Sequence, residues 1–302
     1  MLNNTFLAIA SEVVSALSTN KPVVALESTV IAHGLPRPQN LKTAFRLQET
    51  VRDTGAIPAT IAIIKGKLSV GINDEELRLL AETNNIRKIS TRDLSIAVAM
   101  SWDGATTVAS TTWIAHRAGI RVFATGGIGG VHRGSLPDVS ADLPELARTP
   151  IVVVCSGAKI VLDLPATREW LETNGITVVG YQCDEMPAFY TSHSRLDVDM
   201  RAEGPDQVAK LFRAQQSLGL ESALLVTVPV PAAYDMPEDL LQDALGEALE
   251  EAKRVCIAGS ALTPFLLSRM AKSSEGATLR ANIALLENNA RVAAQIAQSL
   301  EE

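Results

Sequence analysis

Two ionisable side chains interrupt or end apolar runs, where a charge is costly unless it is paired or used. Lys159 follows the run IVVVCSGA, and Glu27 interrupts the run PVVALESTVIAHG. An amine beside apolar walls or other cations has a lowered pKa, which frees its lone pair to attack a carbonyl carbon. A carboxyl group in an apolar setting has a raised pKa and can serve as a general acid or base. The simpler alternatives are a solvated surface lysine and a hydrogen-bonded structural glutamate.

A glycine-rich run, residues 126–134, contains His132. The run does not match the dinucleotide fingerprint G-x-G-x-x-G, because a count started at Gly127 places the histidine where the last glycine belongs. It does not match the P-loop either, because Ser135 stands where a lysine is required. Exposed backbone N–H groups can still approach an anion closely here, and the basic residues His132 and Arg133 lie beside them. A flexible turn is the alternative reading of these glycines.

The segment DVSAD places the oxygen side chains of Asp138, Ser140 and Asp142 two residues apart. In an extended chain they share one face. Hard cations such as Mg²⁺ or Mn²⁺ favour such ligands, often one carboxylate with several waters. Asp142 also fits the N-cap of a helix, with Glu145 three residues further on. A metal or ligand contact and a helix cap are therefore both open for Asp142.

Two further polar residues are candidates for the same site. Lys88, just before Ser90-Thr91-Arg92-Asp93, fits either a phosphate contact or a surface charge. Asn282 lies within a long helical pattern, where asparagine has a poor propensity. It either projects into the site or faces solvent.

Strand and helix patterns alternate along the whole chain. Strands are expected at 22–26, 59–64, 67–72, 85–90, 120–124, 151–155, 176–181 and 222–230, with a hairpin at Lys65-Gly66. Helices are expected at 5–18, 41–54 with Asn40 as its cap, 74–83 with Asn73 as its cap, 93–102, 107–118, 165–174, 205–217, 237–254, 263–272 and 278–300. Residues 33–38 read as irregular because of their glycine and prolines. The alternation predicts one α/β domain over residues 1–302, with a mostly parallel sheet flanked by helices on both faces.

Composition narrows the class of protein. The 302-residue chain carries a formal net charge of −7, which argues against a nucleic-acid surface. An anionic ligand must then be held by a local basic pocket. Three cysteines stand far apart without a CxxC pair, which favours a reducing cytoplasm over a disulfide framework. We read neither a signal peptide nor an apolar run of the ~20 residues that span a membrane.

Eight sequence blocks together resemble the pseudouridine-5′-phosphate glycosidase family. They run in the family's order from about residue 20 to 295: PVVALESTVIAHGLPRPQN, GAIPATIAII, GATTVAST, RVFATGGIGGVHRG, DVSADL, CSGAK, TPFLL and NNA. Two stretches depart from the family pattern, since 133–138 is shorter and 257–262 lacks a lysine. The resemblance implies a lyase that reversibly cleaves the C–C glycosidic bond of pseudouridine 5′-phosphate, giving uracil and ribose 5-phosphate. It also implies one divalent cation per subunit, usually Mn²⁺, and a homotrimer of α/β subunits.

The resemblance also assigns roles to individual residues. Lys159 matches the nucleophile that forms an imine with the ring-opened sugar, Glu27 the proton donor, and Asp138 the metal ligand. The positions that match contacts to the phosphorylated ribose or other active-site positions are Lys88, Val108, Ser140, Ala141, Asp142, His132 and Asn282. Two rivals stay open: an imine-forming lyase of the class I aldolase type, which needs no metal, and a sugar-phosphate sensor without catalysis.

Overall fold

The computed structural model describes residues 6–134, 138–257, 259 and 262–301. Its strands are β1 (Leu7–Ile9), β2 (Val23–Leu26), β3 (Ile57–Ile64), β4 (Lys67–Val70), β5 (Arg87–Ile89), β6 (Gly104–Thr106), β7 (Val122–Ala124), β8 (Val152–Cys155), β9 (Thr177–Tyr181), β10 (Met200–Ala202) and β11 (Leu224–Thr227). Its α-helices are α1 (Ser11–Ser18), α2 (Gln39–Asp53), α3 (Asp74–Glu82), α4 (Leu94–Ala99), α5 (Val108–Arg117), α6 (Asp142–Leu146), α7 (Leu164–Thr173), α8 (Pro205–Ser217), α9 (Glu238–Arg254), α10 (Leu262–Ser273) and α11 (Ala277–Glu301). Shorter helical turns are η1 (Val30–Gly34), η2 (Thr91–Asp93) and η3 (Ala232–Tyr234).

The strands form one sheet in the order β1-β4-β3-β2-β7-β8-β11-β9-β10, and β6 and β5 extend it from β3. Every pairing is parallel except β3 with β4 and β3 with β6. The predicted hairpin is the β3–β4 pair, whose turn at Lys65-Gly66 has positive φ angles. The prediction of an α/β fold with a mostly parallel sheet is confirmed.

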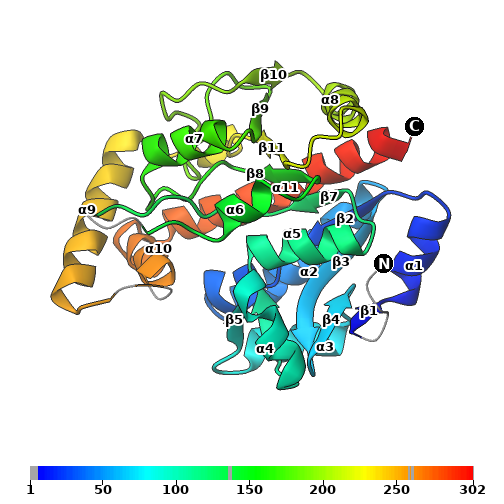
Figure 1. The fold of residues 1–302 in the computed structure, drawn as a ribbon. Helices are drawn as coiled ribbons and strands as arrows, with labels where there is room; N and C mark the ends of the chain where they lie inside the picture. Colours follow the sequence, from blue (N-terminus) through cyan, green and yellow to red (C-terminus); the bar gives the residue numbers. More distant parts are fainter. Residues whose placement is uncertain (1–5, 135–137, 258, 260–261, 302) are drawn as a thin grey trace.

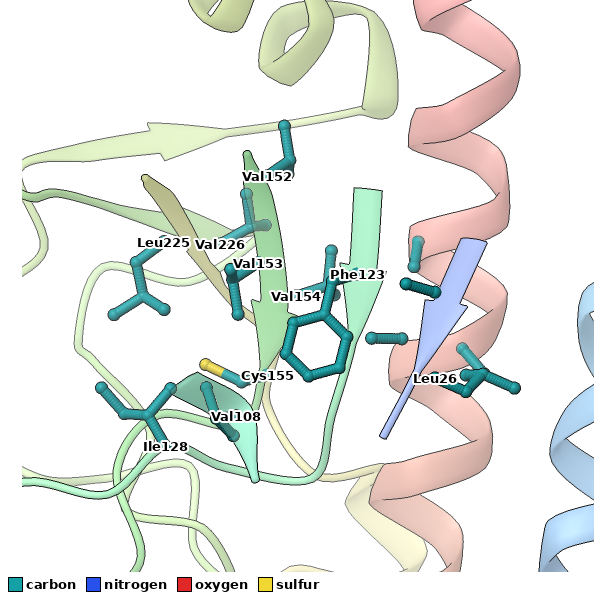
Figure 2. Packing of buried hydrophobic residues seen from close by; sticks show 14 of the residues in the cluster. Leu26, Val108, Phe123, Ile128, Val152, Val153, Val154, Cys155, Leu225 and Val226 are labelled. Atoms are coloured by element: carbon teal, nitrogen blue, oxygen red, sulfur yellow. The ribbon is translucent and has the colours of Figure 1, made fainter. Parts of the chain in front are cut away.

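Helices cover the sheet, and the long α11 runs beside β2, β7 and β8 in its centre (Figure 1). In the same view α5 and α6 lie across the sheet from α11, while α9 and α10 form a hairpin at one side (Figure 1). The central strands β2, β7, β8 and β11 are buried along their whole length. Figure 2 shows Phe123, Val153 and Cys155 of these strands packed near Val108 and Ile128 within one hydrophobic cluster. In the part of the chain that the structure describes, no helix is long and apolar enough to cross a membrane.

Most predicted elements are confirmed within a few residues, and the reasons are visible locally. Asn73 caps α3 as predicted: its side chain accepts from the backbone N–H groups of Glu75 and Glu76, and the Glu76 carboxylate accepts from the Asn73 N–H. The predicted end of the 41–54 helix is confirmed, since α2 ends at Asp53 and Gly55 follows with a φ of +89°. The three C-terminal helices fall where their spacing placed them.

Three predictions about elements are wrong. The predicted helix at 5–18 begins only at Ser11, because Leu7–Ile9 instead extends the sheet as β1 beside β4. Asn40 does not cap α2; it lies inside that helix and donates its side-chain hydrogens to the carbonyls of Ile31 and Ala81. The segment read as irregular from residue 33 begins inside the π-helical turn η1. Strands β6 and β10, which were not predicted, are three residues long each.

Candidate active site

Glu27 stands directly after β2, beside the neighbouring strand β7, whose next residue is Thr125. The Thr125 hydroxyl donates a hydrogen bond of 2.5 Å to Glu27 Oε1, and Glu27 is only 8% exposed. Burial raises the pKa of Glu27, and the nearby Lys159 charge and the Thr125 hydrogen bond offset only part of that rise. A carboxyl group of this kind keeps its proton to higher pH than usual, as a general acid requires.

Lys159 reaches the same edge of the sheet through the turn that follows β8. Gly157 makes the turn possible: its φ is +73°, and an added Cβ would collide with the Pro187 carbonyl oxygen. The Lys159 N–H then donates to the Ile128 carbonyl at 3.2 Å, which fixes the end of the turn against the glycine-rich run. Burial raises the pKa of the neighbouring Cys155 thiol to about 12, so that thiol stays protonated. Of these two side chains, Lys159 lines the pockets described below and is the candidate nucleophile.

Two adjoining pockets meet at these residues. The larger, which we call the outer cleft, has a volume of about 670 Å³ and is lined by polar and basic side chains. The smaller, the inner lobe, has a volume of about 70 Å³ and walls that include Val30, Phe189 and Leu267. Both pockets share the residues Glu27, Thr29, Lys88, Lys159 and Thr263.

The structure brings all the sequence-predicted site residues to these two pockets. Those that line the outer cleft are Glu27, Lys88, Val108, His132, Asp138, Ser140, Ala141, Asp142 and Lys159. Asn282 projects from α11 into the inner lobe and is 6% exposed, so it does not face solvent. Burial lowers the pKa of Lys88, and the neighbouring charge of Lys159 lowers it further. Two neighbouring cationic side chains suit this place for an anion, although the chain as a whole is acidic.

Asp142 connects the glycine-rich run to the start of α5. Its two carboxylate oxygens accept backbone hydrogen bonds from Ala109 (2.9 Å) and Gly129 (2.8 Å). Of the two roles left open for Asp142, the N-cap is wrong, because α6 begins at Asp142 itself and Ala141 is its N-cap. A side chain at Gly129 would collide with Ser140, so glycine is required for this close approach. These contacts place the Ser140–Asp142 segment over the first turn of α5.

The wall of the outer cleft near Asp138 can accommodate a divalent cation that is coordinated mainly by water and by a bound substrate. Among the residues that it describes, no three His, Cys, Asp or Glu side chains come close enough to hold a metal ion together. Asp138 is exposed on the wall of the outer cleft, with Ser140 and Asp142 on the same wall. This arrangement fits a cation with one carboxylate ligand and several waters, and it does not form a closed protein cage.

Sequence reasoning missed two residues that support the segments carrying Glu27 and Lys159. Thr125 orients Glu27, and Asn289 of α11 is fully buried between the turns after β7 and β8. The Asn289 amide donates to the Thr125 carbonyl at 2.9 Å and to the Ser156 hydroxyl at 3.2 Å. Two adjacent asparagines inside a long helix, in the NNA block, were the available signal. The departures noted at 133–138 and 257–262 fall partly on positions 135–137, 258 and 260–261, which lie outside the described residues.

Fold and site define an α/β protein whose pocket is lined by a buried carboxyl group, Glu27, and by Lys159. A family model described as "Indigoidine synthase A like protein" matches residues 12–299, and the chain belongs to this family. A protein of Caldanaerobacter subterraneus named pseudouridine-5′-phosphate glycosidase is 50% identical, over 99% of this chain and 98% of its own. A protein of that name from Hahella chejuensis is also 50% identical, over 98% and 99% of the two chains. The crystal structure of the prealnumycin C-glycosynthase AlnA in complex with ribulose 5-phosphate has 38% identity and a TM-score of 0.90, covering 98% of this chain and 97% of its own.

Proposed function

We propose that this protein is a pseudouridine-5′-phosphate glycosidase, which reversibly cleaves the C–C glycosidic bond to give uracil and ribose 5-phosphate. The observation that carries the proposal is the position of Glu27 and Lys159 together where the polar outer cleft meets the apolar inner lobe. The full-length relatives named for this activity support it. The structural neighbour solved with a pentulose phosphate supports a sugar-phosphate ligand.

The outer cleft is polar and basic whereas the inner lobe is largely apolar, and the substrate likewise has a charged ribose phosphate and a planar base. The outer cleft offers Lys88 and the N-terminal turn of α5 at Val108, which suit a phosphorylated ribose. The inner lobe offers the Phe189 ring, apolar walls and the amide of Asn282, which suit a planar base with polar edges. The bond to be cleaved then lies at the residues that both pockets share.

Lysine chemistry solves the problem of a carbon leaving group, which has no lone pair to protonate. The Lys159 amine bonds to C1′ of the ribose while the C1′–O4′ bond breaks and O4′ takes a proton. The sugar is then an open chain that carries the amine at C1′. The nitrogen lone pair can now stabilise positive charge that develops at that carbon.

Glu27 provides the proton that makes uracil leave. Its raised pKa keeps the carboxyl group protonated until it gives its proton to C5 of the ring. The C1′–C5 bond breaks with its electron pair on the uracil, and the lysine nitrogen forms a C=N bond to C1′. Water adds to this imine and releases ribose 5-phosphate and free Lys159. In the reverse direction uracil and the aldehyde join with loss of water, which is the reaction of a carbon–oxygen lyase.

We propose that a divalent cation, Mn²⁺ by family resemblance, binds with Asp138 as its carboxylate ligand. A bound cation would offset phosphate charge in the outer cleft. Chelation with EDTA should then lower turnover, which an aldolase-type rival without a metal would not show. Asp138→Asn should weaken Mn²⁺ binding at least tenfold by isothermal titration. Equal affinity in the variant would remove Asp138 from this role.

The direct test is uracil release from pseudouridine 5′-phosphate. The wild-type protein should release uracil, and it should act on unphosphorylated pseudouridine at least a hundredfold less well, because the basic pocket is built for phosphate. Glu27→Gln should lower turnover by about 10²–10⁴-fold while the protein remains folded. A wild-type protein that binds the phosphate but releases no uracil would favour the sensor alternative.

Two wider expectations accompany this function. The family resemblance predicts a homotrimer, which sedimentation equilibrium of the purified protein would measure. The free cysteines Cys155, Cys183 and Cys256 support a reducing compartment, and we propose the cytoplasm.

A further inference from the structure

The chemistry above leaves one titratable side chain of the inner lobe without a task. His33 lines this lobe with Glu27 and Asn282. Its Nε2 atom is buried and has no hydrogen-bond partner. A buried polar atom without a partner is unfavourable, so an unpaired imidazole nitrogen at a pocket points to a ligand contact.

The backbone around His33 is also unusual. It belongs to η1, a π-helical turn of five residues that begins shortly after Glu27. Short π-helical segments are rare and occur often at functional sites. The turn is held firmly, because the buried Asn40 amide donates to the carbonyls of Ile31 (3.0 Å) and Ala81 (2.9 Å). The fold therefore fixes His33 at the wall of the lobe.

His33 is suited to accept a hydrogen bond. Burial and the charge of Lys88 lower its pKa, and a backbone hydrogen bond with Ile86 raises it by less. The imidazole is thus neutral at neutral pH, and a neutral imidazole has one nitrogen that accepts. Uracil presents ring N–H donors that need an acceptor when the base is taken out of water.

We propose that His33 accepts a hydrogen bond from N1–H of the uracil ring in the inner lobe. The inference rests on the proposed function and deepens it. N1 is conjugated through C6 to C5, the carbon that takes the proton from Glu27, whereas N3 lies between two carbonyl groups. An acceptor at N1–H raises the electron density at C5 without removing a proton from the ring. His33 then assists protonation of C5 and selects the base.

The test uses the synthetic direction, with ribose 5-phosphate and uracil, 1-methyluracil or 3-methyluracil. The wild-type protein should prefer uracil over 1-methyluracil by at least about tenfold in kcat/KM. In His33→Ala the rate with uracil should fall, because the hydrogen-bond acceptor for N1–H is lost. The preference for uracil over 1-methyluracil should shrink to within about threefold, because the imidazole no longer collides with the N1-methyl group. The preference against 3-methyluracil should not change. His33→Gln, which keeps an acceptor, should recover part of the preference.

Two controls separate the possible causes. Val30→Ala enlarges the same lobe from the same turn but leaves the acceptor, so it should keep the preference for uracil over 1-methyluracil. Borohydride trapping of ribose 5-phosphate on Lys159 should be equal in the wild type and His33→Ala, which shows that the variant is folded and its sugar site intact. If the wild type makes no product from uracil, the proposed function fails. If it does, and His33→Ala keeps the full discrimination, the role of His33 alone is overturned.

Discussion

Glu27 is buried beside a hydroxyl donor and a lysine, and burial has the larger effect on its carboxyl group. Its pKa in the folded protein is raised above the ordinary 4.5. The fold therefore favours the protonated form. This contribution to stability is complete below pH 4.5 and is lost as the pH rises through the raised pKa of the folded protein.

Glu27→Gln removes this titration and should stabilise the protein at neutral pH. The gain in unfolding free energy should be largest near pH 7 and disappear at pH 4, because only the wild type pays for ionising a buried carboxyl group. Urea unfolding of both proteins at pH 4, 5.5 and 7 measures it. Glu169→Gln, on the exposed side of α7, is the matched control. A Glu27→Gln effect that is the same at all three pH values would contradict the direction of the shift.

The sequence could predict the proposed catalytic pair, Glu27 and Lys159, because both residues contrast with their neighbours. Glu27 and Lys159 are ionisable residues at the ends of buried strands, and parallel strands bring such ends to one edge. His33 and Asn289 could not be found in this way. One lies on a π-helical turn that has no sequence pattern of its own, and the other has its partners 133 and more residues away.

At the scale of elements, Asp142 joins three segments that are separate in the sequence. Asp142→Asn leaves one side-chain acceptor for the two N–H groups of Ala109 and Gly129. We expect a loss of about 1–3 kcal/mol in unfolding free energy, because one buried donor loses its partner. The KM for ribose 5-phosphate should rise, because the first turn of α5 and the glycine-rich run separate.

The matched control for this prediction is Asp163→Asn. Asp163 caps α7 by accepting from the Ala166 N–H with one oxygen, and asparagine caps a helix about as well. Urea unfolding and ribose 5-phosphate kinetics of the two variants give the comparison. An equal loss of unfolding free energy and an equal rise in KM in both variants would contradict the role given to the two Asp142 hydrogen bonds.

Element prediction succeeded where local signals were strong and failed where the tertiary context decided. The capping box at Asn73 and the glycine after α2 are complete within a few residues of sequence. The strand β1 is three residues long and forms only because β4 offers a free edge. Asn40 and Asp142 have the residue types of helix caps, but their partners lie in other segments, which no local pattern contains.

At the scale of the whole molecule, α11 connects the C-terminal end of the chain to the strands that carry the candidate site (Figure 1). Asn289 makes that connection through the Thr125 carbonyl and the Ser156 hydroxyl. Asn289→Ala should lower the unfolding free energy by about 1–3 kcal/mol and also lower turnover, because Thr125 orients Glu27. Asn288→Ala is the neighbouring control, since Asn288 is half-buried, donates one long hydrogen bond of 3.5 Å to the Pro229 carbonyl and accepts an exposed one from Arg291. Thermal and urea unfolding compare the two, and equal destabilisation would argue against the special role of Asn289.

The fold class followed from alternating patterns, but the order of strands did not. Strand β11 inserts between β8 and β9, and β3 pairs with β4, β2 and β6. Such arrangements depend on packing between distant segments. The resemblance to a known family, which several blocks carry together, supplied the substrate class that periodicity and spacing could not.

The central claim is that Lys159 forms an imine with ribose 5-phosphate, and trapping this imine tests it most directly. The protein is incubated with ribose 5-phosphate, reduced with borohydride, digested and mapped by mass spectrometry. We predict one sugar-phosphate adduct on the peptide that contains Lys159, and no adduct there in Lys159→Arg, which keeps the charge. An unmodified Lys159 in a wild-type protein that releases uracil from pseudouridine 5′-phosphate would contradict the imine mechanism.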